Sequence, residues 1–123
     1  MKIDIYNHVM PMRYLEKMKE HSKDQGIIKR MTSLRMLWDI EARVKMLEQW
    51  PDLQQVLTLS VPPPELVGGP ELSPELARIA NDDLAAMVAK WPKRFPAFVA
   101  SLPMNNVPAA LEEMDRAIEK LGA

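Results

Sequence analysis

The sequence predicts an α/β fold in which parallel strands alternate with helices. Apolar residues alternate with polar ones at the start of the chain, form an almost continuous run in residues 55–61, and recur at helical spacing between these segments. The resulting order of strand, helices, strand, helix, strand, helix is typical of parallel strands joined by right-handed crossovers. We predict strands near residues 2–6, 55–61 and 95–102 and helices near residues 12–20, 39–49, 74–90 and 108–121.

The first strand places Ile3 and Ile5 on one face and Asp4 and Tyr6 on the other. The helix that follows is predicted from three apolar residues at helical spacing, which are Met12, Leu15 and Met18. The next stretch, residues 21–37, shows no sustained periodicity. We expect it to contain only a short helix near residues 27–31.

The second predicted helix has Asp39 as its N-cap, and Pro51 prevents its continuation. The apolar strand of residues 55–61 is typical of a parallel strand buried on both faces. A run of three prolines ends this strand. Up to residue 72 we expect a loop without regular structure.

The helix of residues 74–90 has the clearest beginning, because Ser73 is a favoured N-cap and Pro74 suits the first helical position. The third strand, residues 95–102, is interrupted by Pro96. The last helix is expected to begin with Asn106 as its N-cap and to end with Gly122 as its C-terminal cap. The apolar residues of this helix share one face: Leu111, Met114, Ile118 and Leu121.

Composition excludes several classes of function. The 123 residues, 47% of them hydrophobic, suffice for one domain, and a net charge of -1 argues against a nucleic-acid partner. The absence of cysteine excludes disulfides, thiolate metal sites and a cysteine nucleophile. No apolar run approaches the roughly 20 residues that span a bilayer, and the N-terminus has no signal-peptide pattern. We therefore expect a cytoplasmic protein without a membrane partner.

Three parallel strands leave two unpaired edges, so the predicted sheet looks incomplete. A (βα)8 barrel needs about 250 residues, which is more than twice this length. The residues alone leave two possibilities open: a part of a larger barrel, or a small open α/β domain that pairs with a partner.

Residues 3–11, which include Asp4, Tyr6, His8 and Pro11, resemble the first-strand motif of the amidohydrolase superfamily, in which an Asp precedes a His-x-His pair and a proline. The group that contains aminocarboxymuconate-semialdehyde decarboxylase is the most similar one. Three further stretches fit that group: Leu37 to Asp39 with Arg43, Asn81 to Leu84, and Trp91 to Phe95 with Ser101 to Met104. The resemblance covers nearly the whole chain and is weakest at residues 12–36. It implies that the chain forms the N-terminal three β-α units of a (βα)8 TIM-like barrel.

The resemblance also implies a divalent metal, with zinc as the expected ion and His8 as a ligand. Alternate strand residues point to the same side, so both members of a His-x-His pair reach one metal at the C-terminal mouth of a barrel. Tyr6 replaces the first of these histidines, and its phenol must lose a firmly held proton before it binds zinc. Either the site has lost its metal, or Tyr6 has another role while His8 and residues beyond Ala123 hold the ion. The family's other ligands are expected beyond these 123 residues, so we do not expect the chain to catalyse a reaction alone.

Three residues are expected to contact the substrate. Tyr6 is expected to line the pocket or donate a hydrogen bond. Arg35 lies in the excursion from which related decarboxylases bring an arginine to a substrate carboxylate, although a solvated surface arginine is the alternative. Asn105 ends the third strand and is expected to face the mouth of the site.

The resemblance therefore implies that the whole protein is a metal-dependent decarboxylase, a lyase, acting on small carboxylated substrates. A metal-dependent hydrolase of the same superfamily and a non-catalytic, self-associating half-barrel are the two alternatives. We expect a homo-oligomer, because ten methionines and open strand edges favour self-association.

Overall fold

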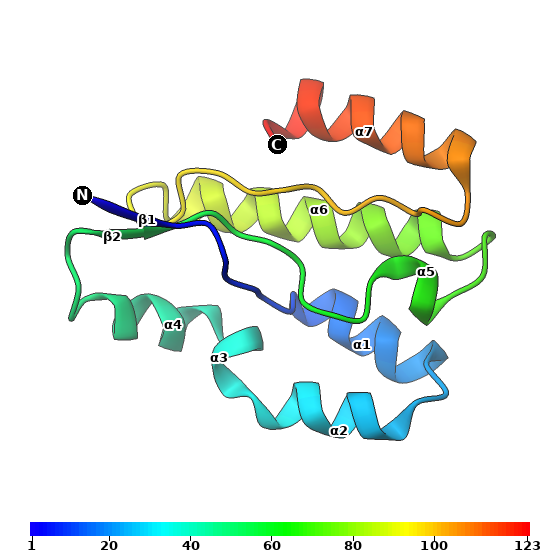
Figure 1. Cartoon of the computed structure of the whole chain (residues 1–123), viewed down its shortest axis with the longest axis horizontal. Helices are drawn as coiled ribbons and strands as arrows, with labels where there is room; N and C mark the ends of the chain where they lie inside the picture. Colours follow the sequence, from blue (N-terminus) through cyan, green and yellow to red (C-terminus); the bar gives the residue numbers. More distant parts are fainter.

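A computed structural model describes residues 1–123 as an α/β arrangement of two short parallel strands and seven helices (Figure 1). The strands are β1 (Lys2–Asp4) and β2 (Leu53–Gln55). The helices are α1 (Met12–His21), α2 (Gln25–Ser33), α3 (Arg35–Trp38), α4 (Ile40–Leu47), α5 (Pro64–Val67), α6 (Ser73–Lys90) and α7 (Val107–Leu121). None of these helices has both the length and the apolar character needed to cross a membrane.

The two strands pair in parallel, with Lys2 opposite Leu53 and Asp4 opposite Gln55. The first strand is shorter than the predicted residues 2–6. The prediction of a regular strand over residues 55–61 was wrong, because β2 lies before most of that run and overlaps it only at Gln55. Beyond them the parallel alignment continues only as an isolated bridge between Val9 and Leu59.

The prediction of a regular strand over residues 95–102 was wrong. This segment runs parallel to the chain after β2, but it forms one isolated bridge, between Leu57 and Phe98. The Leu57 N–H donates to the Ala97 carbonyl over 3.0 Å, and the Val99 N–H donates to the Leu57 carbonyl over 2.9 Å. Pro96 has no N–H to extend this ladder toward the start of the segment, so an extended but irregular third segment results.

The stretch before α4 is more helical than the sequence predicted. Asp24 caps α2 by accepting a hydrogen bond from the Ile27 N–H over 3.0 Å, and α2 extends well beyond the predicted residues 27–31. The predicted loop up to residue 72 is also corrected, because it contains α5. Pro64 and Val67 are buried there, and Pro64 at the start of the helix with Glu65 in its first turn also favours a helical turn.

Three of the predicted caps are confirmed. Asp39 accepts a hydrogen bond from the Ala42 N–H over 3.0 Å, Asn106 accepts one from Ala109, and Gly122 has the left-handed conformation (φ 73°). The prediction that Ser73 is an N-cap was wrong. Ser73 is the first residue of α6, and its buried hydroxyl donates to the Asn105 side chain, so it caps no helical N–H.

The apolar core has two clusters, and α6 contributes to both. Leu76 and Ala80 of α6 pack with the buried face of α1, which includes Tyr14, against α2 and α5. Leu84, further along α6, belongs to the second cluster, whose other members come from the strand segments and α4: Val9, Leu47, Leu57, Phe95 and Phe98. The long helix α6 therefore supports the extended segments along their length.

Helix α7 packs on α6 through small and polar side chains. Its buried residues are Ala110, Glu113 and Ala117. Its apolar face, predicted from residues 108–121, is only partly covered, because Leu121 packs against the second core cluster whereas Leu111 and Ile118 are 55% and 58% exposed. This face is therefore open to contact with other parts of a larger assembly.

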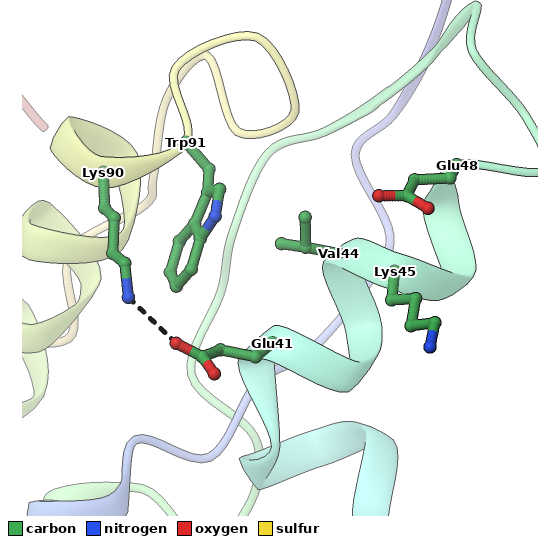
Figure 2. Close-up of a pocket in the computed structure, with 6 residues that line it drawn as sticks. All are labelled: Glu41, Val44, Lys45, Glu48, Lys90 and Trp91. Atoms are coloured by element: carbon green, nitrogen blue, oxygen red, sulfur yellow. Dashed lines mark hydrogen bonds and ion pairs between the residues drawn. The ribbon is translucent and has the colours of Figure 1, made fainter.

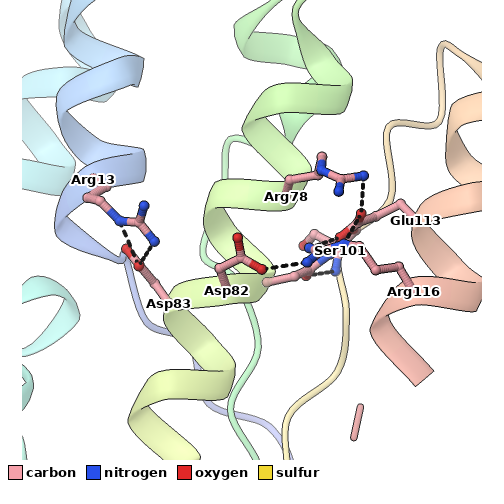
Figure 3. A network of polar contacts seen from close by, with 8 residues as sticks. Arg13, Arg78, Asp82, Asp83, Ser101, Glu113 and Arg116 are labelled. Carbon is pink, nitrogen blue, oxygen red and sulfur yellow. Dashed lines mark hydrogen bonds and ion pairs between the residues drawn. The ribbon is translucent and has the colours of Figure 1, made fainter. Parts of the chain in front are cut away.

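A polar network joins the two helices (Figure 3). Glu113, 2% exposed, accepts hydrogen bonds of 2.8 Å from Asn81 on α6 and from Arg116 one turn away on α7. Arg116 also donates to Asp82 over 2.7 Å. These hydrogen bonds raise the pKa of Arg116, and the Glu113 contact contributes most. Because Asn81 also bonds both backbone groups of Ser101, the network fixes α7 and the third extended segment on α6.

Candidate functional site

The candidate site lies just beyond the C-terminal ends of β1 and β2. β1 ends at Asp4, whose Oδ1 accepts a hydrogen bond from the Tyr6 N–H over 2.9 Å, and the chain bends at Tyr6. The buried side chain of Asn7 then donates to the carbonyls of Val56 (2.7 Å) and Asp4 (3.1 Å). The Asn7 side-chain amide thus makes the hydrogen bonds that a strand N–H would otherwise make. The chain leaves the sheet at this point, and the His8 side chain is exposed to solvent.

The ring of His8 is exposed and held from one side only. Its Nδ1 lies 2.7 Å from the Thr58 Oγ1, and the Thr58 hydroxyl donates to the Asn7 carbonyl. The Tyr6 ring meets the His8 ring edge to face at 5.4 Å and is 86% exposed. His8 Nε2 has no hydrogen-bond partner in the protein, so it is free to bind a ligand.

Buried polar groups lie beneath this histidine. Arg43 of α4 donates from Nη1 to the His8 carbonyl over 2.7 Å. Burial lowers the pKa of the Arg43 guanidinium, and the negative charge of Asp4 acts in the opposite direction. Gln55 donates to Asp4 Oδ2 over 3.0 Å. Three buried atoms here have no partner, and they are Asn7 Oδ1, Arg43 Nε and Gln55 Oε1.

The structure brings together two of the four sequence-predicted site residues, Tyr6 and His8. Arg35 is paired with Asp39 (Nη2 to Oδ2, 2.8 Å) at the junction of α3 and α4. Asn105 donates to the Gly68 carbonyl over 3.1 Å and accepts a hydrogen bond from Ser73. Neither Arg35 nor Asn105 bonds to His8 or Tyr6. Their predicted contacts with a substrate therefore stay predictions.

Sequence reasoning missed three residues of the site: Asn7, Arg43 and Thr58. Thr58 carried a signal, because it is a hydroxyl residue within the otherwise apolar run of residues 55–61. Arg43 carried a weaker one, a charged residue on the buried face of α4. Neither signal indicates a partner, since His8 and Thr58 are 50 positions apart in the sequence.

The residues around His8 offer few free groups to a metal ion. His8 Nε2 is a suitable nitrogen ligand. Both carboxylate oxygens of Asp4 already accept hydrogen bonds, from Tyr6 and Gln55. No group of three His, Cys, Asp or Glu side chains is arranged to hold a metal ion. The residues fit one ligand position of a metal, and they do not form a metal site by themselves.

A separate surface groove lies between α4 and the C-terminal end of α6 (Figure 2). There Lys90 forms an ion pair with Glu41 over 3.0 Å and lies 4.3 Å from the centre of the Trp91 ring. Charged groups of the groove are thus already partly paired with each other. The groove also lies where the strands begin, whereas ligand sites of parallel α/β proteins lie at the carboxyl ends of the strands. His8 is therefore the better candidate site.

Comparison of sequences finds decarboxylases. The chain is 37% identical over 87 residues to a gamma-resorcylate decarboxylase from Polaromonas sp. and 38% identical to one from Rhizobium sp.. Each match covers 70% of this chain and 26% of the relative, so the chain is much shorter than these proteins. No family model matches the sequence.

Comparison of structures also finds decarboxylases, together with an amidohydrolase. A dihydroxybenzoic acid decarboxylase from Polaromonas sp., solved with manganese and the inhibitor 2-nitroresorcinol bound, matches with a TM-score of 0.76 at 32% identity. The match covers 98% of this chain and 36% of that one. An amidohydrolase from Staphylococcus aureus matches with a TM-score of 0.71 at 29% identity, over 98% of this chain and 34% of that one. The chain belongs to the amidohydrolase superfamily and corresponds to the N-terminal part of these longer members.

Proposed function

We propose that the protein is a metal-dependent decarboxylase of small carboxylated aromatic substrates, in which these residues form the first β-α units of a (βα)8 barrel. The observation that carries this proposal is the position of His8 at the end of β1, with Nδ1 held by Thr58 and Nε2 free. The likeness to decarboxylases, one of them with manganese bound, supports it.

In this proposal His8 supplies one ligand of a divalent ion, zinc or manganese, and the remaining ligands come from outside the 123 residues. Such an ion, when bound, stabilises negative charge that develops on the substrate. Tyr6 lines the pocket beside His8. Arg35 and Asn105 are further candidates for substrate contacts, and for this role they have to exchange their present partners for the substrate.

The test uses the complete gene product that contains this chain. We expect it to release carbon dioxide from 2,6-dihydroxybenzoate in the presence of zinc or manganese. His8→Ala should remove the bound metal, measured by elemental analysis, and lower kcat/KM at least about 100-fold. Loss of a metal ligand should reduce activity at least as much as loss of the groups that orient the ligand. His21→Ala, at an exposed histidine on the last turn of α1, is the matched control and should change neither quantity.

Two results would contradict this proposal. An unchanged metal content in the His8→Ala protein would remove His8 from the ligand set. Hydrolysis of an amide or ester substrate, without any decarboxylation, would assign the protein to the hydrolases of the superfamily instead.

A second function, self-association as a non-catalytic half-barrel, is favoured by the exposed apolar face of α7. Leu111 and Ile118 are exposed on this face, and Ile118 lines an apolar groove together with Val99, which is 55% exposed. Sedimentation velocity of the 123-residue chain at micromolar concentration should then give a dimer or larger species. Leu111→Glu combined with Ile118→Glu should restore the monomer. A wild-type chain that sediments as a monomer would argue against this function.

A further inference from the structure

The hydrogen bonds around Thr58 fix the position of a proton on His8. The Thr58 Oγ1 lies within hydrogen-bond distance of two groups, the His8 Nδ1 at 2.7 Å and the Asn7 carbonyl oxygen. A hydroxyl has one proton to donate, and a carbonyl oxygen only accepts. The Thr58 proton therefore belongs to the contact with Asn7. The remaining contact requires the His8 Nδ1 to be the donor.

We propose that Thr58 is a positioning residue that holds His8 in the Nδ1–H tautomer, so that the lone pair of Nε2 faces outward. In neutral imidazole one nitrogen carries the proton and the other accepts. With Nδ1 protonated, Nε2 is the nitrogen with the lone pair, and it is the one without a partner in the protein. The ligand that this arrangement suits is a divalent cation that accepts nitrogen donors, such as zinc.

The backbone around Thr58 prevents the hydroxyl from changing partners. The Val9 N–H donates to the Thr58 carbonyl over 2.9 Å, and the Ser60 N–H donates to the Val9 carbonyl over 2.8 Å. Thr58 is thus held directly across from the peptide that follows His8. A β-branched side chain also has few χ1 rotamers, which keeps Oγ1 in place.

The backbone on either side of the histidine is held as well. The Asn7 side chain donates to the Val56 carbonyl over 2.7 Å, and Arg43 donates to the His8 carbonyl over 2.7 Å. The Asn7 carbonyl and the His8 backbone are thereby fixed relative to Thr58. The proton position follows from this geometry alone and is independent of any metal. Its use in binding a metal rests on the proposed function.

The inference is tested by nitrogen NMR of the metal-free chain at about pH 9, where unperturbed histidines are neutral. Protonated and unprotonated ring nitrogens give well-separated resonances. The chain has only two histidines, and His21→Gln assigns both. We expect the wild-type His8 to carry its proton on Nδ1. A proton on Nε2 of the wild-type His8 would overturn the inference without the use of any Thr58 variant.

Two variants test the role of Thr58 itself. Thr58→Val keeps the shape and removes the hydroxyl, so the His8 signals should shift to the average of two tautomers. Thr58→Ser keeps the hydroxyl and should restore the wild-type pattern, and an unchanged circular dichroism spectrum of both variants reports an intact fold. A Thr58→Val protein that keeps the wild-type His8 pattern would show that Thr58 does not set the tautomer.

Metal affinity of the complete gene product separates this inference from the proposed function. We expect Thr58→Val to weaken zinc binding about 10–100-fold and Thr58→Ser to restore it, because groups that orient a ligand have effects of this size. If the NMR result holds and zinc does not bind at all, the tautomer assignment stands and the metal-dependent function fails.

Discussion

The polar network between α6 and α7 and the polar groups around His8 differ in how completely their hydrogen bonds are satisfied. Around Glu113 both carboxylate oxygens accept hydrogen bonds, and the Asn81 amide is bonded on both sides. Around His8 three buried polar atoms, on Asn7, Arg43 and Gln55, have no partner, and the histidine ring is exposed. Both regions place charged or amide groups in the interior.

This difference indicates what each region is for. Buried polar groups are normally satisfied, and a fully bonded network such as that of Glu113 fixes one arrangement of two helices. Groups left without partners cost stability, and they concentrate where a protein has a use for them other than folding. The α6–α7 network is therefore structural, and the unsatisfied groups around His8 support the proposal that this region is the functional one.

Glu113→Ala tests the structural half of this comparison and should have the largest effect. It leaves Arg116 with only Asp82 as a carboxylate partner and removes one of the two acceptors of the Asn81 amide, which should lower the free energy of unfolding by about 3 kcal/mol. Urea denaturation measures this loss. Glu112→Ala, at the exposed neighbouring position, should change the free energy by less than about 0.5 kcal/mol. Equal effects of the two substitutions would break the comparison.

Arg43→Met tests the functional half and should have a smaller effect. The guanidinium is buried without a carboxylate hydrogen-bonded to it and with Nε unsatisfied, so its removal relieves a desolvation cost as it breaks the bond to His8. Replacement of a buried charge by an apolar side chain of similar length is often near neutral, and we expect a change within about 1 kcal/mol by urea denaturation. Lys45→Met, on the exposed face of α4, is the matched control. A loss as large as that of Glu113→Ala would show that Arg43 is structural.

A third test compares these two buried regions with a polar contact at the surface, that of Asp39. The contribution of Asp39 to the pH dependence of stability should be the smallest of the three effects. Hydrogen bonds from the Ala42 N–H and then from Arg35 lower the pKa of the Asp39 carboxyl. A carboxyl with a lowered pKa stabilises the fold above its unfolded pKa of about 3.9, and this contribution is lost as pH falls through the folded value. Asp39→Asn keeps a good cap and removes the charge. The melting temperatures of wild type and variant should therefore converge between pH 5 and about pH 2, and a constant difference would contradict the role of the charge.

The features that sequence predicted correctly depend on residues close together in the chain. The caps at Asp39 and Asn106 bond to N–H groups three residues away, and Gly122 adopts its conformation without any distant contact. Ser73 has the same local signal as Asp39. Its hydroxyl instead bonds to Asn105, 32 positions away, and nothing near Ser73 in the sequence indicates this partner.

The same reason explains what could be predicted of the site. The resemblance of residues 3–11 to a family motif indicated His8 and Tyr6, and the structure places their rings in contact. Thr58 could not be paired with His8, because the pairing depends on the parallel register of β1 and β2 and on the bend after Asp4. The predicted strand of residues 95–102 failed for a related reason, since its length depends on neighbours that local sequence does not specify.

The bonds that hold His8 also determine when the site can form during synthesis. The contacts of the Asn7 and His8 peptides with Val56 and Thr58 join residues 49 to 51 positions apart. Residues that leave the ribosome first cannot make these bonds until the segment after β2 has followed them. The backbone hydrogen bonds of helix α1 are local, so the helix can form earlier. A nascent chain that stops before residue 58 therefore contains the histidine without the environment that fixes its proton.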